Sequence, residues 1–286
     1  MEFIESPQDS FQLPEGKFSF WRYLFLIFIV IGVTLVSQSI LILIASLIEG
    51  NMDVLNFPPF TFLWVSMLPF AALLVFLVIG IRLIHQQTFK SIFTQKVHFN
   101  RSLMIKSAII WFVLSALADI IIAFTQPGNY SYTFSLRSFI PFMSLAVILI
   151  VFQITAEEVF FRSYLLHGFK RLFRFQWLAI ITQAIMFGIL HGANPEVTTY
   201  GILTTMPFYI GIGLLLGWLT HKFRGLEIAL GLHFANNLYA TTMVTFTGSA
   251  ISSPAIFTIM DYQPETGLIA FAILALLFGL IITRVK

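Results

Sequence analysis

Long apolar stretches separated by short polar segments recur along the whole chain. We expect eight helices from them, near residues 23–48, 62–84, 103–124, 139–160, 177–193, 199–220, 226–246 and 266–284. Several of these runs are long enough to cross about 30 Å of hydrocarbon. The runs are continuous and about twice the length of a barrel strand, which argues against a membrane β-barrel. The pattern therefore predicts an all-α, polytopic membrane bundle of about eight transmembrane helices.

The composition agrees with a location in the membrane. Hydrophobic residues make up 58% of the 286 residues, charged residues only 10%, and the mean hydropathy is +0.91. A soluble protein of this composition would expose far too much apolar surface. The chain has no cysteine, which excludes disulfides and thiolate metal sites or nucleophiles. Its net charge of +3 is small, and its basic residues flank the apolar runs, so we expect membrane lipids and no nucleic acid as partners.

Positive charges are distributed unevenly among the predicted loops. With eight spans, Arg137 alone of the 16 Lys and Arg residues falls on one side of the membrane, and the other fifteen fall on the opposite side. Because basic loops tend to stay in the cytoplasm, we expect both termini to be cytoplasmic. We treat residues 1–22 as a polar N-terminal leader and residues 23–286 as a single transmembrane domain.

Three short polar segments interrupt the apolar pattern. They contain Glu157, Glu158 and Arg162; Phe187 and His191; and His233 and Asn237. An ionisable side chain at membrane depth is costly, so such residues usually mark a functional site.

Helical geometry brings the first two segments to the same level. If the fourth span continues to a turn near residues 174–176, Glu157 lies about seventeen residues before the turn and His191 about sixteen after it. In an antiparallel hairpin the two residues then have nearly the same height. Glu158 and Arg162 are four residues apart and can pair on one helix face. Glu157 is turned about 100° from Glu158, so it can face a cavity.

Each of these groups also has an ordinary structural explanation by itself. A Glu–Arg pair can stabilise a helix near the membrane surface, a lone histidine can be interfacial, and asparagine often joins membrane helices. Because the groups come from three spans and two of them have same-face spacing, we expect one shared polar site. Gln153 lies one turn before Glu157 on the same face. Asp119 stands apart, and we expect it near the outer end of the third span, solvated or paired there.

At these positions the sequence resembles the CPBP family of membrane proteins. This family comprises CAAX proteases and bacteriocin-processing proteins and is also named the Abi or type II CAAX prenyl endopeptidase family. The resemblance rests on the motifs EExxxR, FxxxH and HxxxN, in that order, and covers about residues 139–245. It implies an intramembrane endopeptidase that opens toward the cytoplasm and cleaves a membrane-associated or lipidated substrate.

The resemblance also implies roles for individual residues. The residue matching Glu157 activates a water molecule, helped by the one matching His191. Those matching His233 and Asn237 stabilise the oxyanion. Glu158, Arg162 and Phe187 are expected to support the site.

The sequence leaves several alternatives open. Family members are often labelled metalloproteases, and Glu157, His191 and His233 would make an acceptable zinc ligand set. We favour a site without metal, because no His-Glu-x-x-His is present and a metal-bound Glu157 would leave the base unassigned. A non-catalytic membrane protein that binds a sensor kinase or bacteriocin is a second interpretation. A transporter is a third, but it needs broken helices or inverted repeats that we do not find. The substrate is open among CAAX tails, Gly-Gly leader peptides and membrane-anchored regulators.

Overall fold

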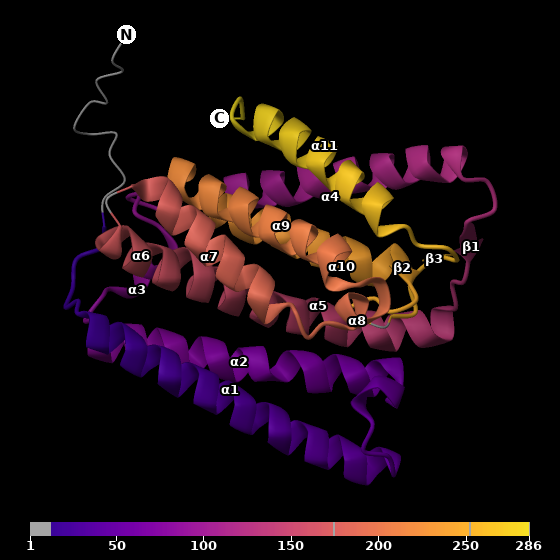
Figure 1. Cartoon of the computed structure of the whole chain (residues 1–286), viewed down its shortest axis with the longest axis horizontal. Coiled ribbons are helices and arrows are strands. Elements are labelled where there is room, and N and C mark those ends of the chain that lie inside the picture. Colours follow the sequence, from indigo (N-terminus) through magenta and orange to yellow (C-terminus); the bar gives the residue numbers. More distant parts are fainter. Residues whose placement is uncertain (1–12, 174, 252, 286) are drawn as a thin grey trace.

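The computed structural model describes residues 13–173, 175–251 and 253–285 (Figure 1). Residues 1–12 of the predicted leader and Arg174 of the predicted turn lie outside these ranges. The elements are, in chain order, α1 (Phe20–Glu49), the 3₁₀ turn η1 (Val54–Asn56), α2 (Pro59–Ile84), α3 (Phe89–Phe93), α4 (Arg101–Thr125), β1 (Tyr130–Tyr132), α5 (Leu136–Glu157), the π-helix η2 (Glu158–Leu165), α6 (Leu166–Leu172), α7 (Gln176–Leu190), α8 (Pro195–Tyr200), α9 (Ile202–Phe223), α10 (Glu227–Thr242), β2 (Val244–Phe246), β3 (Phe257–Ile259) and α11 (Pro264–Ile282).

The prediction of an all-α membrane bundle is confirmed. Each predicted span corresponds to a helix in the described part of the chain, namely α1, α2, α4, α5, α7, α9, α10 and α11. Six described segments are long and apolar enough to cross a membrane, and one of them joins α5, η2 and α6 into a segment of 37 residues. The remaining two helices are shorter, with 15 residues in α7 and 16 in α10. The count of eight crossings and the cytoplasmic position of both termini stay predictions.

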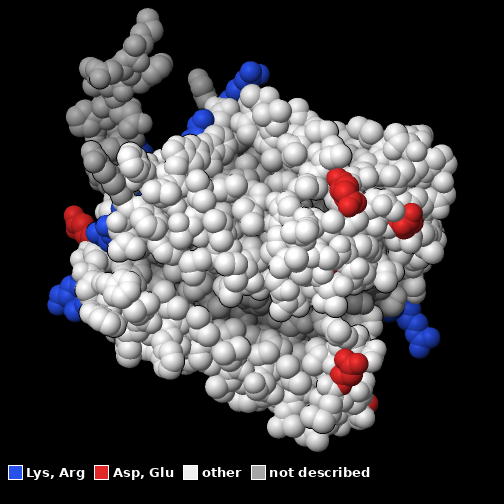
Figure 2. Space-filling model, in the orientation of Figure 1, with Lys and Arg blue, Asp and Glu red and all other residues white. Residues whose placement is uncertain are grey.

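The peripheral helices α1 and α4 bury few of their residues. In the most apolar part of α1 the mean hydropathy is 2.6 and only 6% of the residues are buried; the corresponding values for α4 are 2.3 and 6%. Figure 2 shows a face that is almost uncharged across its middle, with acidic and basic groups toward the two ends. Such a surface would associate in water, whereas it matches the hydrocarbon of a bilayer, so these helices face lipid.

Small residues allow the helices that carry the site to pack closely. A side chain at Gly231 of α10 would collide with the carbonyl oxygen of Met104 on α4. Beside this contact the Ser107 hydroxyl donates to the carbonyl oxygen of Ile228, at 2.8 Å. Close backbone approach at glycine is typical of membrane helix pairs. α10 is thereby fixed against α4.

Three short strands form a small sheet at the end of the molecule opposite α3 and α6 (Figure 1). β3 lies in the middle, antiparallel to β1 and parallel to β2. β1 and β3 lie in segments that the sequence predicts as plain loops. The sheet joins the connection between α4 and α5 to the connection between α10 and α11.

The described part of the leader packs on the other end of the bundle. The Lys17 amide donates to the His85 carbonyl oxygen at 2.7 Å, and Arg171 donates to the Pro14 carbonyl oxygen at 2.7 Å. The Arg171 guanidinium also lies 3.5 Å from the centre of the Phe18 ring. Burial lowers the pKa of His85, which keeps its ring neutral between the Lys17 carbonyl and the Tyr164 hydroxyl.

Candidate active site

The two adjacent glutamates lie where α5 changes into a π-helix. α5 ends at Glu157, and the π-helix runs from Glu158 to Leu165 with all eight residues buried. π-helical turns are rare and frequently occur at functional sites. Glu157 and Glu158 both have a carboxylate oxygen within 4 Å of a ring nitrogen of His233 on the neighbouring helix α10.

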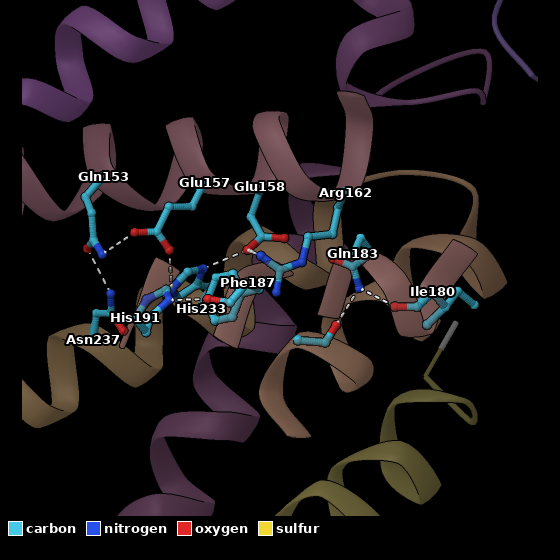
Figure 3. Close-up of polar contacts among 11 residues, drawn as sticks. Gln153, Glu157, Glu158, Arg162, Ile180, Gln183, Phe187, His191, His233 and Asn237 are labelled. Carbon is cyan, nitrogen blue, oxygen red and sulfur yellow. Dashed lines mark hydrogen bonds and ion pairs between the residues drawn. The ribbon is translucent and has the colours of Figure 1, made fainter. Parts of the chain in front are cut away.

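Glu158 holds both an arginine and a histidine. Its Oε1 accepts a hydrogen bond from Arg162 Nη1 at 3.1 Å and lies 2.7 Å from Nδ1 of His233 on α10 (Figure 3). All three side chains are buried. A carboxylate can only accept, so we assign the Nδ1 proton of His233 to this bond. The expected Glu158–Arg162 pair is present, and Glu158 in addition orients His233.

Glu157 faces the same histidine from its other side. Its Oε2 lies 3.7 Å from His233 Nε2, and its Oε1 accepts a hydrogen bond from Gln153 Nε2 at 2.8 Å. Gln153 in turn accepts a hydrogen bond from Asn237 Nδ2 at 2.8 Å (Figure 3). Glu157 is only 4% exposed, so it points into the bundle and not into lipid.

His191 caps the end of α7 and joins the site through aromatic contacts. Its Nδ1 lies 2.7 Å from the Phe187 carbonyl oxygen, and its ring lies 4.2 Å from the Phe187 ring and 4.5 Å from the Tyr209 ring, measured between centres. Phe187 also contacts Arg162, whose guanidinium lies 4.3 Å from the ring centre, and the ring of His233 lies 6.3 Å away. Phe187 therefore separates His191 from the charged pair behind it.

The structure brings the seven predicted residues together from α5, the π-helix, α7 and α10. The sequence analysis did not include Gln153 in the site, although its spacing from Glu157 put it on the right face. It also missed Asn236, which accepts from the Trp111 indole at 3.2 Å and donates to Asn237 Oδ1 at 3.2 Å. Trp111 is far away in the sequence, so no local spacing could have indicated this contact.

A second polar group adjoins His191. The Tyr209 hydroxyl accepts from Asn194 at 2.8 Å and donates to the Glu196 carboxylate. Burial raises the pKa of Glu196, which lies in the short helix α8 outside the membrane-spanning segments. These residues were not predicted, because the spans expected at 177–193 and 199–220 left no separate helix at the position of α8.

The arrangement does not support a metal centre. Within the ranges that the structure describes, no three His, Cys, Asp or Glu side chains come close enough together to hold a metal ion. The alternative ligand set of Glu157, His191 and His233 therefore does not fit a metal as placed, and we assign no step to one.

The fold and this site define a multi-pass membrane protein with a buried cluster of carboxylate, imidazole and carboxamide groups. Residues 138–239, which contain all three motifs, match the family model described as type II CAAX prenyl endopeptidase Rce1-like. A curated relative, "Uncharacterized protein YyaK" of Bacillus subtilis (strain 168), is 27% identical over 260 residues that cover 87% of each chain. These matches confirm the resemblance to the CPBP family and support a protease of the CAAX type.

Proposed function

We propose that this chain is an intramembrane endopeptidase in which Glu157 activates a water molecule to hydrolyse a peptide bond. The observation that carries the proposal is the buried pair of Glu157 Oε2 and His233 Nε2, 3.7 Å apart. The family match supports a prenylated CAAX tail as the first substrate to test. The basic residues predict that the site opens toward the cytoplasm.

Glu157 is suited to act as the general base. Gln153 donates to Oε1 and so fixes the carboxylate, while Oε2 takes no hydrogen bond from the described residues. In the proposed step, the water oxygen attacks the carbonyl carbon while Oε2 accepts the water proton. The carbon–nitrogen bond then breaks, and the same proton passes to the leaving amine. The products are a carboxylic acid and an amine.

The two histidines have different protonation requirements. The Phe187 carbonyl fixes the Nδ1 proton of His191, so Nε2 of the neutral ring is an acceptor that can orient the water. Glu158 fixes the Nδ1 proton of His233 in the same way. His233 can therefore donate to a developing oxyanion through Nε2 only when both of its ring nitrogens carry a proton.

Asn237 is suited to be the second oxyanion donor. Its amide nitrogen has two hydrogens, and Gln153 accepts one of them. The other is available to a substrate oxygen. One donor of this kind contributes about 2.7–4 kcal/mol in a protease where it has been removed.

The decisive experiment measures cleavage of a prenylated CAAX peptide and of a Gly-Gly leader peptide by purified protein. We expect Glu157→Gln to lower kcat by about 10²- to 10⁴-fold while the variant still inserts and melts like the parent. Glu265→Gln is a matched control, because that carboxylate lies in the first turn of α11 away from the site. We also expect exhaustive chelation to leave the rate unchanged.

The same experiment tests the alternative of a non-catalytic binding protein, which the family match does not favour. Unaltered cleavage by Glu157→Gln would remove Glu157 from the mechanism. If the parent protein cleaves neither peptide, and if cells that carry Glu157→Gln keep the biological effect of the parent protein, a binding protein is supported instead.

A further inference from the structure

A separate cavity of about 200 Å³ lies where α4, α10 and α11 meet the three-stranded sheet. Figure 1 shows the sheet, and the ends of these helices that adjoin it, at the end of the molecule opposite α3 and α6. One face of α4 lines it from Trp111 to Gln126, a distance of about 22 Å along the helix at 1.5 Å per residue. The cavity is therefore elongated along the membrane-crossing direction of α4.

The two ends of this cavity differ in character. Trp111 and Phe271 line it and belong to the hydrophobic core, with only 1% and 8% of their surfaces exposed. Asp261 and Gln263 line it near the sheet and are exposed to the outside. The cavity thus runs from an apolar interior to a polar mouth, as a site for an amphiphilic molecule does.

The polar part of the cavity favours a cation. Two of its described lining residues, Asp119 and Asp261, are acidic, and none is Lys, Arg or His. The Asp119 carboxylate accepts a hydrogen bond from the Tyr130 hydroxyl at 2.8 Å and interacts with Tyr239. A hydroxyl leaves the charge of a carboxylate uncompensated, and a carboxylate within a membrane span normally pairs with a cation.

Aromatic rings surround the same carboxylate. Tyr130, Tyr239 and Tyr262 all line the cavity, and Tyr262 stacks on Phe246 with ring centres 3.8 Å apart. Burial raises the pKa of Tyr262 to about 12, so its hydroxyl stays neutral. Aromatic faces next to carboxylates attract ammonium groups by cation–π interaction.

We propose that this cavity binds an amphiphile with an ammonium head and an apolar chain. The head lies between Asp119 and Asp261 among the tyrosines, and the chain extends along α4 toward Trp111. The ligand is an amine-bearing lipid or a free lipophilic amine, which share this chemistry. The inference does not depend on the proposed peptidase activity, because none of the seven residues predicted for the active site is among the described residues that line the cavity.

The test measures binding to the purified full-length chain in uncharged maltoside micelles. The probes are dodecylammonium, dodecanol with the same chain but no charge, and butylammonium with the same charge but a short chain. We expect saturable binding of dodecylammonium that is at least tenfold tighter than binding of either control. Equal affinity for dodecanol would overturn the ammonium site, and equal affinity for butylammonium would overturn the amphiphile.

Two variants locate the binding. We expect Asp119→Asn, which keeps an acceptor for Tyr130, to weaken dodecylammonium binding at least tenfold. Glu15→Gln, which changes an exposed carboxylate at the other end of the molecule, should leave it unchanged. Ala270→Leu fills the cavity from α11 and should weaken both dodecylammonium and dodecanol. Elution profile and melting temperature check that each variant is folded. Unchanged binding in folded Asp119→Asn or in folded Ala270→Leu would place the amine elsewhere.

A competition experiment distinguishes the two sources of the ligand. If phosphatidylethanolamine lowers the apparent affinity for dodecylammonium and phosphatidylglycerol does not, the natural ligand is an amine-bearing lipid. The absence of competition supports a free lipophilic amine.

Discussion

The carboxylates of Glu157 and Glu158 are adjacent in the chain but have different partners. Glu158 accepts from Arg162 and His233, so its charge is balanced inside the protein. Glu157 accepts from the neutral Gln153 and keeps its Oε2 toward His233. In our proposal the first carboxylate therefore positions a histidine, and the second reacts with water.

Replacing Glu158 by glutamine tests this division. We expect Glu158→Gln to lower kcat at least tenfold with little change in KM, because Arg162 and His233 both lose the carboxylate that holds them in place. Peptide cleavage over a range of substrate concentrations gives both constants.

Glu158→Asp is the conservative control and should recover part of the rate. A variant that melts earlier but keeps the parent kcat would show that Glu158 only supports the helix.

The sequence predicted which residues form the site better than it predicted their contacts. Motif spacing placed Glu157 and His191 near one level and put Glu158 and Arg162 on one helix face. It assumed about 100° between successive residues, whereas the chain becomes π-helical from Glu158 onward. The contact of Glu158 with His233 joins two helices that are distant in the sequence, so no spacing within one motif indicated it.

At the scale of elements, the hydrophobic pattern was sufficient to predict the long helices but not the short elements between them. A continuous apolar run predicts a membrane helix because unpaired backbone groups are too costly in lipid. Strands of three residues, such as β1 and β3, have no period to detect, and pairing between distant segments decides them. The end of α10 shows the same effect, because the predicted span continued through the residues that form β2.

The contact between α4 and α10 leaves no room for an added methyl group at Gly231. We expect Gly231→Ala to destabilise the protein by about 1–3 kcal/mol, since the new Cβ meets the Met104 backbone, which no rotamer change can relieve. Because His233 follows two residues later on α10, peptidase activity should fall as well. Thermal melting and the cleavage assay measure these effects.

Gly279→Ala is the matched control, because a Cβ there meets Trp218 at an ordinary 3.7 Å. Equal melting temperatures for the two variants would contradict the close approach of α4 and α10.

At the scale of the whole molecule, the number of crossings depends on the short helices α7 and α10. The segment around α8 lies against the connection that follows β2, since the Tyr200 hydroxyl donates to the Thr247 carbonyl oxygen at 2.7 Å. If α7 and α10 both cross, α8 and the sheet lie outside the cell. If neither crosses, α8 lies on the cytoplasmic side and the sheet lies outside, and the contact between Tyr200 and Thr247 could not form.

Cysteine labelling distinguishes these topologies, and the parent chain is a clean background because it has no cysteine. Val97, Thr198 and Met260 are exposed positions in the connections between the long helices, and Thr198 lies in the short helix α8. With eight crossings, an impermeant maleimide should label Thr198→Cys and Met260→Cys in intact cells, and Val97→Cys only after permeabilisation. Labelling of Met260→Cys without Thr198→Cys would reduce the count to six. Labelling of Val97→Cys alone would reverse the orientation and turn the candidate site away from the cytoplasm.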